Sequence, residues 1–158
     1  MNRHAPIDPV AELKANVAVP FERASAMPRS VYTSEAFLKR EIEDLFAREW
    51  YCVGRVDQFQ KPGDYVATEL AGRPILVIRD KDGMLRAFSN VCRHRMSTLL
   101  HGSGNAQSIV CPYHAWTYGL DGRLRGAPGM SLNEAFDRDA ICLPEARCEE
   151  WLGFVMVS

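Results

Sequence analysis

The sequence contains Cys92-Arg93-His94, which is followed after sixteen residues by Cys111-Pro112-Tyr113-His114. Each motif is short enough to occupy one hairpin tip, so two tips can close on one metal centre. The side chains offered are two thiolates and two imidazoles, a set that suits Zn²⁺ or an iron–sulfur cluster and suits Mg²⁺ or Ca²⁺ poorly. The stretch therefore predicts a metal site whose candidate ligands are Cys92, His94, Cys111 and His114.

The order of residues within the two motifs helps to distinguish these metals. Each motif places its Cys before its His. In a mixed-ligand [2Fe-2S] centre two Cys bind one iron and two His bind the other, so each hairpin would give one ligand to each iron. A zinc site is the main alternative, and a Cys92–Cys111 disulfide with two surface histidines is another.

The residues around both motifs resemble a known family. Residues 90–95, Asn-Val-Cys-Arg-His-Arg, and residues 111–118, Cys-Pro-Tyr-His-Ala-Trp-Thr-Tyr, are similar to the Rieske [2Fe-2S] motif of Rieske non-haem iron oxygenase alpha subunits. These are the ring-hydroxylating dioxygenases and the choline-monooxygenase-like enzymes, and the resemblance covers about residues 30 to 158. It implies a Rieske [2Fe-2S] cluster bound by Cys92, His94, Cys111 and His114.

The resemblance also implies a function and partners. The chain would transfer electrons as the N-terminal part of an aromatic-ring or quaternary-amine hydroxylating oxygenase. The electrons would come from a reductase or ferredoxin and pass to a mononuclear Fe(II) in a catalytic domain. Intact members of the family form homotrimers, in which the Rieske domain of one subunit serves the catalytic iron of the next.

Two departures distinguish this site from high-potential Rieske proteins. Ser97 and Tyr113 occupy the positions of two further cysteines that form a disulfide beside the cluster, and Trp116 replaces a Ser that donates to a cluster sulfur. Tyr118 does match a tyrosine of those proteins. Because fewer hydrogen bonds to sulfur stabilise the reduced cluster less, we predict a potential toward the low end of the Rieske range of about −150 to +300 mV.

Length, charge and cysteine content restrict the possibilities further. The 158 residues fit one domain, and a net charge of −1 argues against a nucleic-acid partner. No apolar stretch approaches the ~20 residues of a membrane span. The five cysteines suggest no secreted disulfide framework, so we expect a cytoplasmic protein in which Cys52, Cys142 and Cys148 are small buried hydrophobes.

Three segments are predicted along the chain. Residues 1–30 contain four prolines and are expected to form an extended arm, either disordered or laid against a neighbouring subunit. Residues 31–49 are expected to form an amphipathic helix capped by Thr33 or Ser34. Residues 50–158 then form the Rieske domain. Stand-alone Rieske ferredoxins usually lack the preceding helix.

The pattern from Trp50 onward is typical of short strands separated by turns. The predicted strands are residues 50–56, 64–70, 74–80, 85–90, 108–111, 141–143, 146–151 and 154–157. Residues 96–107 are expected to form a loop with an exposed His101, and residues 126–140 an excursion with one helical turn at 132–136. The fold class is therefore mainly β, an antiparallel sandwich or barrel with two metal-binding hairpins after an N-terminal α-helix.

A second iron site cannot be assembled from this sequence. Mononuclear Fe(II) needs two His and one carboxylate, and only His4 and His101 remain outside the motifs. We therefore assign no catalytic residue and expect the electron-transfer half of an oxygenase, cut off or encoded alone. A stand-alone Rieske ferredoxin and a zinc-stabilised binding module are the other hypotheses, and analysis of metal and acid-labile sulfide separates the zinc module from both redox proteins.

Overall fold

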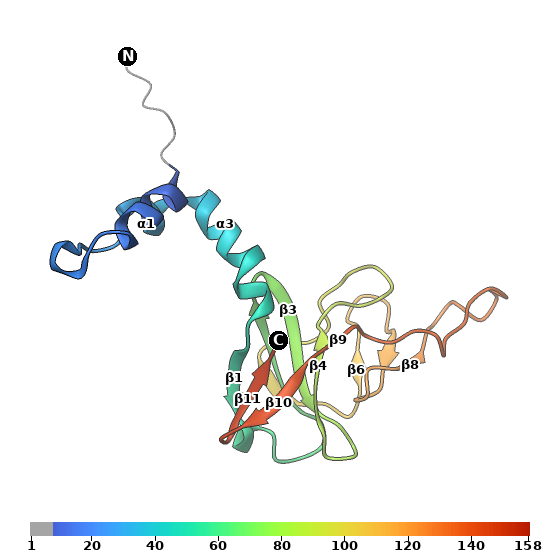
Figure 1. Cartoon of the computed structure of the whole chain (residues 1–158). Helices are drawn as coiled ribbons and strands as arrows, with labels where there is room; N and C mark the ends of the chain where they lie inside the picture. Colours follow the sequence, from blue (N-terminus) through green and yellow to red (C-terminus); the bar gives the residue numbers. More distant parts are fainter. Residues whose placement is uncertain (1–7) are drawn as a thin grey trace. The chain divides into compact units, whose positions relative to one another are not determined.

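The computed structural model describes residues 8–158, which fall into two compact units, one ending at Arg48 and the other running from Glu49 to Ser158 (Figure 1). Among the described residues, no helix is both long enough and apolar enough to cross a membrane.

The described part of the first unit starts with a helix, so the predicted extended arm is wrong for that part. Asp8 caps the N-terminus of helix α1 (Pro9–Val17), and its side chain accepts the backbone N–H of Val10 at 3.0 Å. Pro9 was one of the four prolines that suggested an extended arm. Proline is favoured at the first position of a helix, because the N–H that it lacks would have no hydrogen-bond partner there. A short 3₁₀ turn, η1 (Phe21–Arg23), follows. The prediction for residues 1–7 lies outside the described residues.

The helix predicted over residues 31–49 is divided into three pieces. They are α2 (Arg29–Thr33), α3 (Glu35–Asp44) and the 3₁₀ turn η2 (Phe46–Arg48). Ser34 is extended, and its hydroxyl accepts the Phe37 N–H at 3.2 Å. The predicted Ser34 cap is therefore confirmed, and the same cap ends α2, because a capping residue cannot itself be helical.

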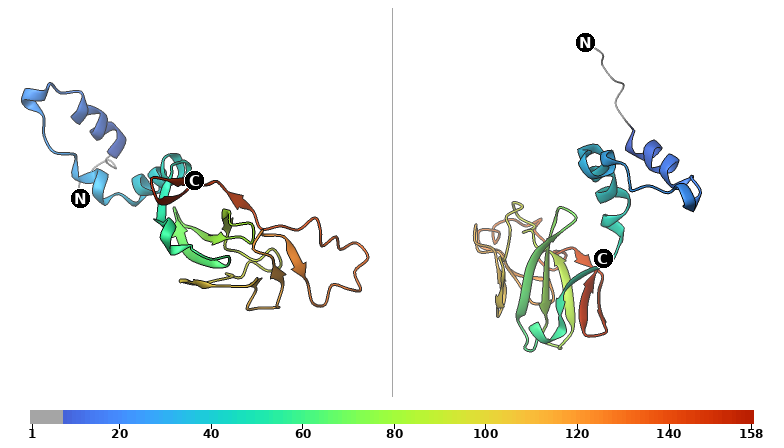
Figure 2. Two further views of the ribbon diagram at one scale, coloured as in Figure 1. Left: turned by 90° about the horizontal axis from the view of Figure 1, so that it is seen from below. Right: turned by 90° about the vertical axis from the view of Figure 1, so that its left-hand side faces the viewer.

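The second unit is built from antiparallel strands, as predicted. The strands are β1 (Tyr51–Arg55), β2 (Asp64–Leu70), β3 (Arg73–Arg79), β4 (Leu85–Ser89), β5 (Ser103–Asn105), β6 (Ile109–Val110), β7 (Thr117–Tyr118), β8 (Leu124–Gly126), β9 (Glu145–Ala146), β10 (Cys148–Trp151) and β11 (Phe154–Val157), with a 3₁₀ turn η3 (Val56–Gln58). They form sheets in the orders β1-β11-β10, β5-β2-β3-β4-β9 and β6-β7-β8. Figures 1 and 2 show the five-stranded sheet between the two smaller ones.

The central strand β3 contributes to a hydrophobic core on each face of the five-stranded sheet, because successive side chains of a strand point to opposite faces. Val77 packs in one core with Phe59, Ala87, Val155 and Val157. Leu76 and Ile78 pack in the other, which extends to the candidate ligands Cys92 and Cys111. The two thiols are therefore part of a hydrophobic core.

Three local expectations were wrong. The predicted loop 96–107 contains β5, which forms because Ser103–Asn105 pairs with β2. These residues have weak strand propensity of their own, so the sequence did not indicate a strand. Turns replace the helical turn expected at 132–136, within the predicted excursion. Cys52 and Cys142 are exposed rather than buried, and Cys148 is half-buried.

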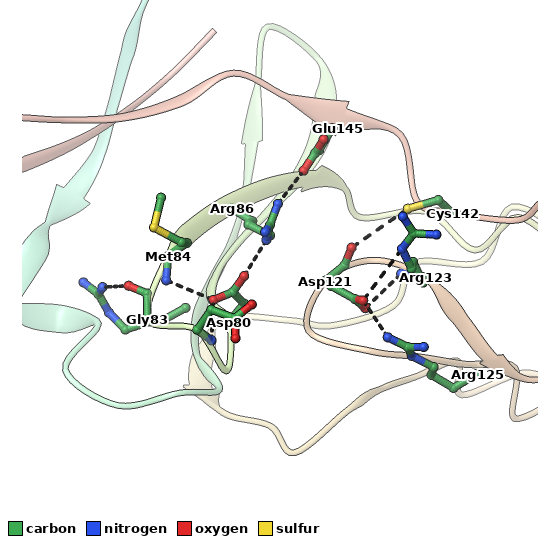
Figure 3. Close-up of polar contacts among 11 residues, drawn as sticks. Asp80, Gly83, Met84, Arg86, Asp121, Arg123, Arg125, Cys142 and Glu145 are labelled. Carbon is green, nitrogen blue, oxygen red and sulfur yellow. Dashed lines mark hydrogen bonds and ion pairs between the residues drawn. The ribbon is translucent and has the colours of Figure 1, made fainter. Parts of the chain in front are cut away.

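A network of charged side chains fixes the turn between β3 and β4 (Figure 3). Asp80, which is 2% exposed, accepts the backbone N–H groups of Asp82 and Met84 at 2.9 Å each. Its other oxygen lies 2.5 Å from Arg86, which also contacts Glu145 of β9 at 3.2 Å. Burial by itself raises the pKa of Asp80, but these hydrogen bonds outweigh it and leave that pKa below its ordinary value.

Candidate metal centre

The two ligand loops share one backbone arrangement. The first is closed by a bridge between Val91 and Thr98, and the second connects β6 to β7. In the first loop the N–H of Cys92 donates to the carbonyl of Ser97, and in the second the N–H of Cys111 donates to the carbonyl of Trp116, both at 2.8 Å.

The same position of each loop adopts a left-handed conformation. Met96 has φ 56° and Ala115 has φ 55°, and each lies four residues after its Cys. Each N–H donates back to the carbonyl of that Cys at 3.1 Å. Left-handed backbone is uncommon for residues other than glycine, and no signal in the sequence pointed to it here. The two loops present their cysteines in equivalent backbone settings.

The structure places both candidate thiol ligands in one hydrophobic core and the two candidate imidazoles side by side. Cys92 is fully buried and Cys111 is 3% exposed. His94 is half-buried and His114 is exposed, and their ring centroids lie 4.9 Å apart at an angle of 61°. The thiols therefore face the core, and the imidazoles form the outer edge of the site.

The arrangement of these side chains can be compared with the ligand sets of the metals considered. Among residues 8–158, no three His, Cys, Asp or Glu side chains converge closely enough to hold a single metal ion. A structural zinc site needs four ligands around one centre, whereas a two-iron cluster needs two Cys at one iron and two His at the other. The paired geometry fits the cluster. All five cysteines lie in the described residues and are free, so the disulfide alternative is not present.

A tyrosine hydroxyl contacts one of the buried sulfur atoms. The Tyr118 hydroxyl lies 3.3 Å from Cys92 Sγ and accepts the Arg93 N–H at 3.0 Å. Burial, followed by the contact with Cys92, raises the pKa of Tyr118, so the hydroxyl keeps the proton that it can donate to sulfur.

The second thiol has a similar environment. Burial by itself raises the pKa of Cys111, but the backbone N–H groups of Tyr113 and His114 stabilise its thiolate and leave the pKa below its ordinary value. A lowered pKa favours the form of cysteine that binds metals. The sulfur side of the site is therefore prepared for an anionic ligand.

Aromatic rings support both histidines. Trp116 stacks on His94 with centroids 4.7 Å apart and an interplanar angle of 6°, and Tyr113 lies against His114 at 3.7 Å. Burial, followed by the positive charges of His114 and Arg95, lowers the pKa of His94. A neutral imidazole is the form that binds metal. The sequence did not show either stacking contact.

The other two histidines do not join the site. His101 is exposed, as expected, and its carbonyl accepts the Tyr65 hydroxyl at 3.4 Å. His4 lies outside the described residues.

Comparison with known proteins identifies the domain. Residues 49–137 match the Rieske [2Fe-2S] domain family. The chain belongs to this family. Its cofactor is therefore a Rieske [2Fe-2S] cluster, and the buried thiols, paired imidazoles and sulfur-directed donors fit that cofactor. The predicted fold class and family are confirmed.

Several relatives are oxygenase components. The carnitine monooxygenase oxygenase subunit of Acinetobacter pittii (strain PHEA-2) is 41% identical over 136 residues, which are 85% of this chain and 37% of that protein. The large oxygenase component of the naphthalene 1,2-dioxygenase system of Pseudomonas aeruginosa is 40% identical and covers 79% of this chain and 29% of that protein.

A solved structure agrees with this relationship. The apo quaternary ammonium Rieske monooxygenase CntA superposes with a TM-score of 0.81 and 42% identity, over 85% of this chain and 40% of that one. This chain therefore spans well under half the length of these relatives. It corresponds to the Rieske domain of Rieske oxygenases, which serves electron transfer.

Proposed function

We propose that Cys92 and Cys111 bind one iron of the cluster, that His94 and His114 bind the other, and that the chain carries electrons within a hydroxylating oxygenase. The observation that carries the proposal is the pairing of two buried thiols with two adjacent, partly exposed imidazoles. A Rieske centre needs this division of ligands between its two irons. When bound, the cluster supplies a site that stores and releases one electron.

The side chains of this chain set the conditions for that transfer. The core around Cys92 and Cys111 excludes water from the sulfur side. Tyr118 holds a proton toward Cys92, and hydrogen bonds to sulfur favour the reduced state. The exposed ring of His114 provides the electron exit at the surface.

The partners follow from the oxygenase relatives. We infer that a reductase or ferredoxin supplies the electron and that a mononuclear iron in a catalytic domain accepts it, within a homotrimer. The relatives are named for carnitine and for naphthalene, and they support a quaternary amine or an aromatic ring as the hydroxylated substrate. The five free cysteines suit a reducing cytoplasm.

Metal analysis tests the ligand set. The chain, purified or reconstituted with iron and sulfide, should contain two irons and two acid-labile sulfides. Cys92→Ser and Cys111→Ser should lose the cluster, whereas Cys142→Ser, at an exposed cysteine, should retain it. One zinc per chain without sulfide would contradict the proposal.

Electron-transfer measurements test the role in an oxygenase. The cluster-loaded chain should be reduced by a suitable reductase with NADH and should hydroxylate none of the candidate amines or arenes by itself. Product should appear when a catalytic domain of a related oxygenase is linked or added. Product from the 158-residue chain alone, or a third tightly bound iron, would show that it contains a catalytic site.

A further inference from the structure

Trp116 carries a buried polar atom without a partner. The residue is 4% exposed, and among residues 8–158 its indole Nε1 is the buried side-chain atom that lacks a hydrogen-bond partner. Indole can only donate, and leaving a buried donor unpaired is destabilising. Buried polar groups are almost always hydrogen-bonded, so an acceptor from outside the polypeptide is indicated.

The surroundings of Trp116 show where that acceptor lies. Its carbonyl accepts the N–H of Cys111, which makes Trp116 part of the second ligand loop. One ring face is stacked on His94 of the first loop, and Phe136 packs against the ring at 5.6 Å and 66°. The indole therefore packs against a candidate ligand of the first loop, while its backbone belongs to the second, and it is shielded from solvent.

We propose that the Trp116 indole N–H donates a hydrogen bond to a sulfur of the cluster while its ring face holds the plane of the His94 imidazole. The inference rests on the proposed ligand set. Sulfide is the acceptor that the cluster brings to a place where the polypeptide offers none, and its negative charge suits an N–H donor. Trp116 is thus a positioning residue with a donor function.

This assignment changes the expectation drawn from the sequence. Trp116 replaces a serine donor of high-potential Rieske proteins, which suggested that a hydrogen bond to sulfur was lost. The unpaired indole instead supplies a donor from the same position of the loop. The reduced cluster carries more negative charge on sulfur, so this bond strengthens on reduction and raises the potential.

Trp116→Phe tests the donor, because phenylalanine retains an aromatic face for His94 and lacks the N–H. Phe136→Leu is the matched control, since it changes the packing against Trp116 and leaves the indole intact. We expect both variants to retain two irons and two sulfides. The midpoint potential should fall in Trp116→Phe by clearly more than in Phe136→Leu.

A spectroscopic measurement on the unaltered chain makes the test independent of how the variants fold. With ¹⁵N-indole tryptophan, electron–nuclear double resonance of the reduced cluster should show one coupled indole nitrogen and its exchangeable proton. The other two tryptophans, Trp50 and Trp151, are exposed and outside the ligand loops. Because this measurement uses the unaltered chain, it still decides the question if a variant loses its cluster.

The outcomes separate this inference from the proposed function. A fully loaded chain without indole coupling, or a loaded Trp116→Phe variant with an unchanged potential, overturns the inference alone and assigns the acceptor to water or a partner. A chain that binds zinc without sulfide overturns the proposed function and this inference with it. Coupling together with a lowered potential supports both.

Discussion

Tyr118 places its hydroxyl 3.3 Å from Cys92 Sγ and accepts the backbone N–H of Arg93 with the same oxygen. Either atom can donate when Cys92 is a thiol, whereas a Cys92 thiolate has no proton and can only accept the proton of the hydroxyl. The contact joins β7 to the first ligand loop across 26 residues of sequence. The position of Tyr118, which follows the second ligand loop, therefore affects the charge on the Cys92 sulfur of the first loop.

Replacing this tyrosine tests the link. Tyr118→Phe should retain the cluster and lower the midpoint potential by about 20–60 mV, since a net hydrogen bond contributes about 0.5–1.5 kcal/mol and a one-electron couple shifts about 59 mV per 1.4 kcal/mol. Redox titration followed by absorbance measures the change. Tyr65→Phe is the control, because its hydroxyl contacts the carbonyl of His101 rather than a thiol. Equal potentials in the two variants would argue against the donor.

Asn90 is predicted to hold both ends of the first ligand loop. Its side chain is 3% exposed, accepts the Leu100 N–H at 3.0 Å and donates to the Leu100 carbonyl at 2.8 Å. Asn90→Asp removes the donor and sets a carboxylate against a carbonyl, so the free energy of unfolding should fall by about 1–3 kcal/mol. Denaturant titration and the rate of iron release to a chelator should both report it.

The exposed Asn133 supplies the control for that substitution. Its side chain accepts the Ala135 N–H at 3.1 Å, which aspartate does equally well. Asn133→Asp should therefore leave stability and iron release unchanged. A similar loss in both variants would mean that added charge, rather than the Leu100 contact, is responsible.

Two glycines with the same backbone conformation are predicted to differ in their tolerance of alanine. Gly122 has φ 79° and a Cβ there would lie 2.6 Å from the Phe88 ring, whereas Gly83 has φ 80° and open space. Both alanine variants carry the strain of positive φ, but Gly122→Ala also displaces a buried ring. It should lose about 1–3 kcal/mol more than Gly83→Ala in thermal or denaturant unfolding. Equal losses would assign the whole effect to the backbone.

Asp80 is predicted to contribute acid sensitivity. Its pKa is lowered in the folded chain, so the unfolded chain binds more protons as pH falls below the ordinary value of 3.8. The stability that it provides is present above that value and is lost as pH falls through the lower, folded-state pKa. Asp80→Asn should be less stable at neutral pH by about 1.5–3 kcal/mol and show a smaller further loss in acid. Unfolding followed from pH 7 to 2 measures the slope.

The sequence was sufficient to predict strand bounds where nearby residues determine where a strand ends. Predicted strands 64–70 and 154–157 coincide with β2 and β11, because glycines with positive φ at Gly63, Gly72 and Gly153 mark their ends. The spacing of the Cys/His motifs likewise predicted the two loops that carry the candidate ligands, and the ligand set itself stays a prediction.

Features that depend on tertiary contacts could not be predicted. Strand β5 exists because β2 supplies its hydrogen-bonding partner. The stacking of Trp116 on His94 joins two loops whose relative placement the sequence does not encode locally. The left-handed conformations of Met96 and Ala115 are likewise fixed by loop closure rather than by residue type.

The burial of Cys92 and Cys111 within one hydrophobic core has a consequence for the life of the protein in a cell. If both thiols bind the cluster, packing of this core is complete only after iron and sulfide have been inserted into the translated chain. Metal binding and folding are coupled in such domains, and chains that open more often are degraded faster. We therefore expect iron starvation to lower the abundance of this polypeptide through proteolysis, so that its steady-state level follows the nutritional supply of iron.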